Sequence, residues 1–185
     1  MQGRVDLSKY SNSWYSPGAS WFTRVLWYLF NRIFFISYFP FSSVKKNLLR
    51  LFGAKVGQGV ILKPHVNIKY PWKLKIGNHC WIGEGVWIDN LDRVVIGDHC
   101  CISQGALLLC GNHDYKKSSF DLKRGEIILE EGVWIGAKAI VCGRVTCKSH
   151  AVLSAGSVAS SDLDAYSIYQ GNPSVKIRNR EIIAQ

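Results

Sequence analysis

Aliphatic residues recur at every sixth position over most of this chain. The longest series runs through Leu129, Ile135, Val141, Cys147 and Leu153. Three shorter series precede it, and they consist of Val56, Leu62 and Ile68, then Ile76, Ile82 and Ile88, and then Ile96, Ile102 and Leu108. A small or β-branched residue follows four positions after most of them, as at Val60, Val66, Cys80, Val86, Cys100 and Ala106. An α-helix repeats every 3.6 residues and an ordinary strand alternates, so neither element explains this pattern.

The repeat predicts a three-sided prism. Each six-residue unit would supply one short strand and one corner, and three units would close one triangular coil. The aliphatic residue and the small residue of each unit would both point inward, so stacked coils would enclose one continuous apolar core between parallel strands. We therefore expect a mainly β chain that folds as a left-handed parallel β-helix.

The repeat is interrupted at places where the prism should be irregular. Two steps are longer than six residues, so we expect corner bulges near residues 70–72 and 90–92. The step from Leu108 to Leu129 is much longer. It predicts an excursion loop over residues 113–126, and connections of this length are often functional.

The repeat also divides the chain into three parts. No hexads occur in residues 1–53, which we expect to form an N-terminal helical segment. Residues 54–164 should form the β-helix, and residues 165–185 a C-terminal tail.

The segment from Trp21 to Phe41 is strongly aromatic. Arg24 and Arg32 interrupt it, and a central arginine is costly in a bilayer, which argues against a membrane span. Two interpretations stay open. The segment is either a helix that caps the open end of the prism, or a peripheral helix at an anionic membrane, attracted by Arg24, Arg32, Lys45 and Lys46.

Composition narrows the choice of partners. The 185 residues carry a formal net charge of +10, with 48% hydrophobic and 19% charged residues, which is typical of a globular protein. The positive charge fits phosphate-bearing ligands or anionic lipid. No zinc-finger, homeodomain or RNP-type motif is present, so we expect no nucleic-acid partner.

Cysteine usage indicates a cytoplasmic protein with reduced thiols. None of the cysteines forms a C-x-x-C pair, and the N-terminus lacks a secretory signal pattern. Cys80, Cys100 and Cys147 occupy inward positions of the repeat, where a thiol acts as a small apolar group. No spacing is typical of zinc ligands, so we expect no metal.

His79 and His99 follow Asn78 and Asp98 at equivalent corners of stacked coils. They are either a ligand pair or corner residues in a left-handed backbone conformation, where histidine is enriched. We favour the corner interpretation.

Several motifs resemble those of the hexapeptide-repeat O-acetyltransferases, especially the colanic acid biosynthesis subgroup. They are LRLFGAKVG (residues 49–57), YPWKLKIG (70–77), GNHDY (111–115), EEGVWIGAKAIV (130–141) and GNPSVKIR (171–178). The resemblance implies a homotrimer that binds acetyl-CoA in grooves between adjacent prisms. It also implies acetyl transfer to a hydroxyl of a sugar in exopolysaccharide biosynthesis. If the acceptor is a lipid-linked oligosaccharide, peripheral binding by the aromatic segment would place the protein at the inner face of the cytoplasmic membrane.

The resemblance also suggests which residues act. By position, His113 would be the general base, and it opens the excursion loop. The residues that would contact acetyl-CoA are Gly136, Ala137, Ala155, Gly156, Ser160, Lys176 and Arg178. Candidate acceptor-binding residues are Asp89, Asn90 and Asp114.

The expected chemistry is direct transfer. An imidazole would take the proton of the sugar hydroxyl as the hydroxyl attacks the thioester, a contribution of ~10²–10⁴-fold. The alternative is an acyl-enzyme formed on Cys110, three residues before His113. Two other functions use the same prism: a non-catalytic scaffold, and a γ-carbonic-anhydrase-like hydratase, which would need three zinc histidines.

Overall fold

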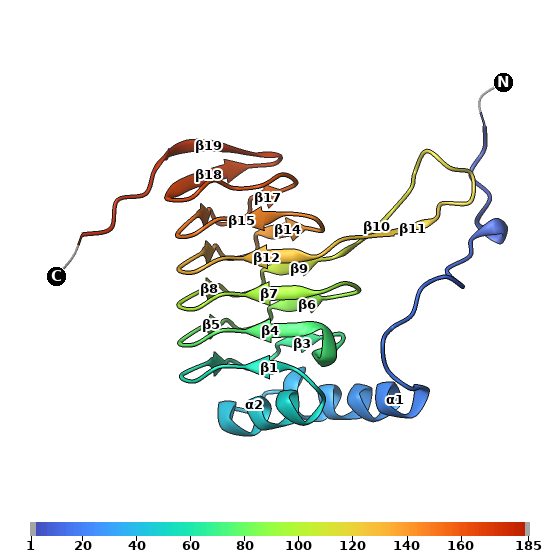
Figure 1. Cartoon of the computed structure of the whole chain (residues 1–185), viewed down its shortest axis with the longest axis horizontal. Helices are drawn as coiled ribbons and strands as arrows, with labels where there is room; N and C mark the ends of the chain where they lie inside the picture. Colours follow the sequence, from blue (N-terminus) through green and yellow to red (C-terminus); the bar gives the residue numbers. More distant parts are fainter. Residues whose placement is uncertain (1–2, 184–185) are drawn as a thin grey trace.

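The computed structural model describes residues 3–183, and most of its strands form three sheets, one on each side of a prism, in which the strands of successive coils pair in parallel. Consecutive strands lie on different sheets, so three strands complete one coil, and the coils are stacked along the prism axis (Figure 1). This arrangement confirms the mainly β, left-handed parallel β-helix that the six-residue repeat predicts.

Each sheet takes one strand from each coil. The first sheet contains β1 (Lys55–Val56), β4 (Leu74–Ile76), β7 (Val94–Ile96), β12 (Ile127–Leu129) and β15 (Thr146–Cys147). The second contains β2 (Ile61–Leu62), β5 (Trp81–Ile82), β8 (Cys101–Ile102), β13 (Trp134–Ile135), β16 (Val152–Leu153), β18 (Ser167–Gly171) and β19 (Ser174–Asn179). The third contains β3 (Asn67–Ile68), β6 (Trp87–Asp89), β9 (Leu107–Leu109), β14 (Ile140–Cys142) and β17 (Val158–Ala159).

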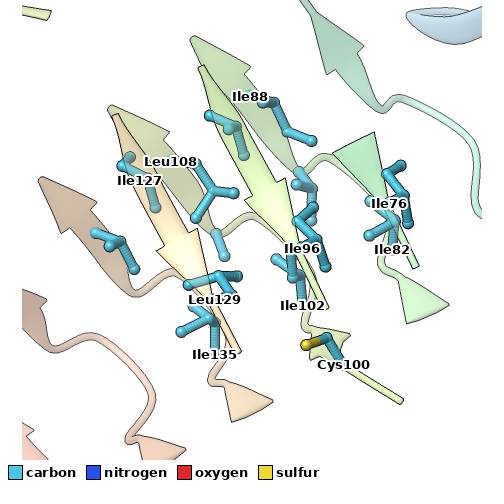
Figure 2. Packing of buried hydrophobic residues seen from close by; sticks show 14 of the residues in the cluster. Ile76, Ile82, Ile88, Ile96, Cys100, Ile102, Leu108, Ile127, Leu129 and Ile135 are labelled. Atoms are coloured by element: carbon cyan, nitrogen blue, oxygen red, sulfur yellow. The ribbon is translucent and has the colours of Figure 1, made fainter. Parts of the chain in front are cut away.

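The aliphatic series stack in register inside the prism. Ile76 pairs with Ile96 and Ile82 with Ile102 in neighbouring coils, and all four side chains are buried. Figure 2 shows these side chains pointing into one shared core together with Cys100. Cys80, Cys100 and Cys147 are fully buried, as their inward positions predict.

The histidine pair occupies corners. His79 and His99 adopt positive φ angles of 54° and 57°, and their rings stack with centroids 5.4 Å apart. The backbone N–H of His99 donates to the carbonyl oxygen of Asn78 one coil below, at 2.8 Å. The corner interpretation is therefore confirmed.

The long step in the repeat is a β-hairpin. After β9 the chain leaves the prism, forms β10 (Gly111–His113) and β11 (Leu122–Arg124) as an antiparallel pair, and returns to begin β12. The hairpin extends far from the sheets, at the right of Figure 1. A shorter bulge contains a 3₁₀ turn, η3 (Pro71–Lys73).

Helices cover the N-terminal end of the prism. Helix α1 (Trp21–Phe30) continues into a π-helical turn, η2 (Asn31–Phe35), and α2 (Ser42–Leu51) follows; both α-helices lie across the first coil in Figure 1. Trp27, Phe35 and Leu49 are buried against the coil, and the indole N–H of Trp27 donates to the carbonyl oxygen of Ile68 at 2.9 Å. One face of the aromatic segment therefore caps the apolar core.

Lys45 was expected to face solvent and to attract anionic lipid, but the structure encloses it. Its side chain is fully buried, and its ammonium donates to the carbonyl oxygen of Lys63 at 2.9 Å, which ties α2 to the prism. Burial lowers the pKa of Lys45 to about 8. Within residues 3–183, no helix is both long and apolar enough to cross a bilayer.

The chain finishes on the second sheet. Strand β18 pairs in parallel with β16, and β19 folds back antiparallel to β18. Residues 167–179 of the region expected as a C-terminal tail are thus part of a sheet.

Candidate active site

A groove runs along the second sheet. Its main cavity has a volume of about 630 Å³ and is lined by Ser103, Gln104, Trp134, Gly136, Ala137, Val152, Leu153, Ser154, Ala155, Ile168, Arg178 and Arg180. The structure therefore brings together Gly136, Ala137, Ala155 and Arg178, four of the residues predicted to contact acetyl-CoA.

Peptide backbone forms one wall of the groove at the turns that follow β13 and β16. A side chain at Gly136 would place its Cβ 2.5 Å from the backbone nitrogen of Ala155, so only glycine allows the two turns to approach this closely. Within residues 3–183, the N–H groups of Ala137 and Ala155 donate to no backbone carbonyl. These amides are available to an elongated polar ligand.

Arginines of the C-terminal hairpin lie along one edge of this cavity. Arg180 donates to the carbonyl oxygens of Gly132 and His150, at 2.9 and 3.1 Å, which fixes its guanidinium. Arg178 is exposed and faces the same cavity. Lys176, Gly156 and Ser160 do not line it.

A second cavity of about 460 Å³ adjoins the first and shares Ser103 and Gln104 with it. Trp81 and Trp134 lie in the two cavities and are about half exposed, and the indole N–H of Trp134 donates to the hydroxyl of Ser103 at 2.9 Å. Sequence reasoning missed these groove residues. The sequence did contain a signal for them: each tryptophan directly precedes the inward isoleucine of a hexad, so its own side chain must point outward.

His113 ends the first strand of the hairpin and pairs with Leu122. Its Nδ1 lies 2.9 Å from the carbonyl oxygen of Phe120. The imidazole also stacks on the Phe120 ring, with centroids 4.4 Å apart and planes 9° from parallel. Two independent contacts thus fix the orientation of the His113 ring.

The contact with Phe120 determines which nitrogen of His113 can act as a base. A carbonyl oxygen only accepts hydrogen bonds, so Nδ1 carries the proton in this interaction. In the neutral imidazole, Nε2 then holds the free lone pair. The hairpin therefore presents His113 in the tautomer that can receive a proton at Nε2.

The N-terminal residues contact the hairpin, which the sequence did not predict. The short 3₁₀ turn η1 (Leu7–Lys9) lies between two such contacts. The N–H of Asp6 donates to the carbonyl oxygen of Ser118 at 2.8 Å, and the ring of Tyr10 lies 5.8 Å from that of His113. Tyr10 is therefore a further aromatic side chain beside the imidazole.

His113 and the groove belong to different sides of the same chain. The hairpin leaves the prism between the third and first sheets, whereas the groove follows the second sheet. In Figure 1 the hairpin extends to the right, while β5 and β8 of the second sheet lie at the left. Among the residues that the structure describes, His113 is not one of those that line the cavity.

The predicted acceptor-binding residues occupy different environments. Asn90 is fully buried, and its amide bonds both the N–H and the carbonyl oxygen of Tyr70, at 2.9 and 2.6 Å. Asn90 therefore braces a corner, and its expected contact with an acceptor is wrong because its side chain is enclosed. Asp89 forms an ion pair with Lys69 at 2.8 Å.

Asp114 lies next to His113 on the hairpin. Its carboxylate is 3.1 Å from the ammonium of Lys123, and this hydrogen-bonded pair holds the pKa of Asp114 below its usual value. A smaller cavity of about 160 Å³ lies at the base of the hairpin, lined in part by Asn112, Lys123 and Arg124.

Cys110 is poorly placed for nucleophilic chemistry. Its side chain is buried, and burial raises the pKa of the thiol to about 12. The reactive species in acyl transfer is the thiolate, which is scarce at neutral pH when the pKa is this high.

Potential metal ligands do not gather in the described part of the chain. Residues 3–183 contain no group of three or more His, Cys, Asp or Glu side chains positioned to hold an ion. The hydratase interpretation, which requires three histidines at one site, therefore receives no support from this arrangement.

No family model matches the sequence. The chain is 39% identical over 133 residues to the "Putative colanic acid biosynthesis acetyltransferase WcaF" of Escherichia coli K12, which covers 72% of this chain and 73% of WcaF.

Solved structures share the fold. The hexapeptide-repeat acetyltransferase VCA0836 of Vibrio cholerae superimposes with a TM-score of 0.78 at 20% identity, over 86% of this chain and 92% of that one. A second crystal structure of VCA0836 is complexed with acetyl-CoA, and it superimposes with a TM-score of 0.70. A maltose O-acetyltransferase from Clostridium difficile 630 gives a TM-score of 0.75 at 19% identity, over 86% of this chain and 87% of the enzyme.

Proposed function

The chain belongs to the hexapeptide-repeat acetyltransferases, and on that premise we propose that it moves an acetyl group from acetyl-CoA to a sugar hydroxyl in exopolysaccharide biosynthesis. The observation that carries this proposal is the groove on the second sheet, where Gly136, Ala137, Ala155 and Arg178 meet. WcaF, at 39% identity, is named for colanic acid biosynthesis, which supports a saccharide acceptor.

The groove fits acetyl-CoA in shape and in charge. Its two adjoining cavities make an elongated channel, and the free amides of Ala137 and Ala155 suit the amide groups of a pantetheine arm. Arg178 and Arg180 at its edge suit phosphate groups, which guanidinium binds with charge-assisted hydrogen bonds. Lys176, Gly156 and Ser160 lie outside the cavity, so the proposed contacts with acetyl-CoA are those of Gly136, Ala137, Ala155 and Arg178.

His113 supplies the base in this proposal. Nε2 takes the proton of the sugar hydroxyl while the hydroxyl oxygen attacks the thioester carbonyl. The imidazolium that results keeps its Nδ1–H bond to Phe120, which strengthens as the ring becomes charged. When the tetrahedral intermediate collapses, the carbon–sulfur bond breaks and Nε2 returns the proton to the thiolate of CoA.

A complete site then requires two copies of the chain. His113 stands on a hairpin directed away from the groove of its own prism, so a neighbouring prism must supply the groove. Two sides of the prism each carry an exposed tryptophan, Trp81 on the second sheet and Trp87 on the third. Exposed apolar side chains on two sides of a three-sided prism favour a homotrimer. His113 of one copy would meet the acetyl-CoA groove of the next.

The same proposal includes a cytoplasmic location. The six cysteines are free in the structure, and reduced thiols and acetyl-CoA are both found in the cytoplasm.

The proposal is tested by following CoA release from acetyl-CoA in the presence of nucleotide sugars, free sugars and lipid-linked oligosaccharides. We expect release to depend on one saccharide class and the product to carry an ester-linked acetyl group. Binding of acetyl-CoA with no transfer to any of the three classes would contradict the proposal.

A further inference from the structure

We propose that the N-terminal cap is a docking surface for an anionic phospholipid membrane. The inference goes beyond acetyl transfer and does not depend on it, because it concerns the end of the prism that carries α1 and α2. Three observations support it: an exposed apolar stripe, the placement of charge along the chain, and a basic groove beside the stripe.

The stripe lies on the face of α1 and η2 that is turned away from the prism. It consists of Trp21, Phe22, Val25, Tyr28, Leu29 and Ile33, all exposed. These positions follow the helical spacing of one continuous face, while Trp27 and Phe35 on the opposite face are buried in the core. The exposed fractions of Trp21 and Phe22 are 70% and 68%, so the cap leaves large apolar side chains without a partner.

Charge is distributed very unevenly along the chain. Residues 7–83 contain eleven lysines and arginines and no aspartate or glutamate. The whole chain has a net charge of +10, so the remainder is close to neutral. The helices and first two coils, which occupy one end of the prism in Figure 1, therefore carry the positive charge of the molecule.

A groove beside the stripe presents basic groups. Its volume is about 340 Å³, and its lining includes Arg24 and Arg32 together with Tyr28 from the stripe. The Nε of Arg24 is buried and has no hydrogen-bond partner among residues 3–183. Arg24 as a whole is only half-buried and Arg32 is exposed, so both guanidinium groups of the groove can attract a phosphate of a lipid headgroup.

The positive charge of the cap also indicates which partner covers the apolar stripe. A second copy docked through the same face would bring two strongly positive ends together, which is unfavourable. An anionic bilayer reverses that effect, and aromatic rings prefer the headgroup boundary. Since no helix of residues 3–183 is suited to crossing a bilayer, the stripe would lie in the plane of the interface.

The test is flotation of the full-length protein, without acyl-CoA, on phosphatidylcholine vesicles with or without phosphatidylglycerol. We expect binding only to the vesicles with phosphatidylglycerol, at low salt, and release by high salt. Vesicle binding is measured separately from catalysis, so its outcome does not depend on whether the protein transfers acetyl groups.

Two variants assign binding to the cap. Trp21→Ser/Phe22→Ser/Ile33→Ser removes stripe area, and Arg24→Gln/Arg32→Gln removes groove charge; each should weaken partitioning by about tenfold or more. The matched controls change residues outside the cap. Ile182→Ser/Ile183→Ser removes two exposed apolar side chains, and Lys116→Gln/Lys176→Gln removes two exposed charges. Both controls should float like the wild type.

The proposal is overturned if the wild type ignores phosphatidylglycerol vesicles at low salt, or if the stripe variant floats as well as the wild type. Sedimentation of each variant provides a separate criterion. A change in oligomeric state caused by the stripe substitutions, with vesicle binding retained, would assign the stripe to contact between copies. Circular dichroism verifies that the variants are folded.

Discussion

The Nδ1 of His113 lies 2.9 Å from the carbonyl oxygen of Phe120, across the β-hairpin that leaves the prism. This bond and the stacked Phe120 ring hold one imidazole with its Nε2 free to accept a proton. Both contacts come from within the hairpin, so the orientation of the base is set locally. The position of the base relative to the substrates would be set by the neighbouring copy.

Replacing the base should affect turnover and leave cofactor binding intact. We expect His113→Ala to lower kcat by about 10²–10⁴-fold, the usual contribution of a general base. The Kd for acetyl-CoA, measured by calorimetry, should stay close to the wild-type value because His113 does not line the groove. Turnover near the wild-type rate would remove His113 from the mechanism.

Cys110→Ala should leave kcat almost unchanged. The buried thiol has a pKa raised to about 12, so it is protonated across the neutral range and is a poor nucleophile. Steady-state kinetics and mass spectrometry of the enzyme mixed with acetyl-CoA provide the check. A labelled Cys110 or an inactive variant would establish an acyl-enzyme in place of direct transfer.

The basic edge of the groove should act on acetyl-CoA binding. Arg178→Gln should raise the KM for acetyl-CoA by roughly tenfold with little change in kcat, because it removes a charge-assisted contact to phosphate. Lys176→Gln is the matched control on the same strand, since Lys176 does not line the cavity. Equal effects of the two substitutions would indicate general electrostatic attraction and no specific phosphate contact.

Lys45 should make stability depend on pH. Its pKa is about 8 in the folded chain and 10.5 ordinarily, so between these values the unfolded chain binds a proton that the folded chain does not. The free energy of unfolding therefore rises as the pH increases through this window.

Because other groups titrate in the same range, the wild type is compared with Lys45→Met in urea unfolding. The difference in stability, wild type minus variant, should rise by about 1–3 kcal/mol between pH 7 and pH 10.5. A difference that stays constant with pH would mean that Lys45 is not desolvated in solution.

The repeat made the prism predictable because each aliphatic position obeys a local rule. The corner histidines His79 and His99 followed from the same register. Asn90 and Lys45 were misjudged for a different reason. Both are polar residues whose burial depends on one specific backbone partner, Tyr70 for Asn90 and Lys63 for Lys45. The pattern of hydrophobic positions does not predict hydrogen bonds of this kind.

The site was predictable only in pieces. Gly136 and Ala155 follow consecutive strands of one sheet, so their proximity follows from the coil length. Tyr10 contacts His113 from more than a hundred residues away in the sequence, with no repeat to set its register, and the sequence contains no sign of that contact. The relation between the His113 hairpin and the groove depends on a second copy, which the pattern of a single chain cannot specify.

The most direct test of this account is complementation between two inactive variants, His113→Ala and Ala137→Trp, the second of which fills the groove with an indole. The two chains are co-expressed with different tags, and oligomers carrying both tags are purified and assayed for acetyl transfer. In a cyclic trimer with shared sites, each mixed oligomer regains one intact site of three, so we predict about a third of wild-type turnover. If the mixed oligomers are as inactive as either variant alone, His113 and the groove do not meet across a subunit boundary, and the shared-site account is contradicted.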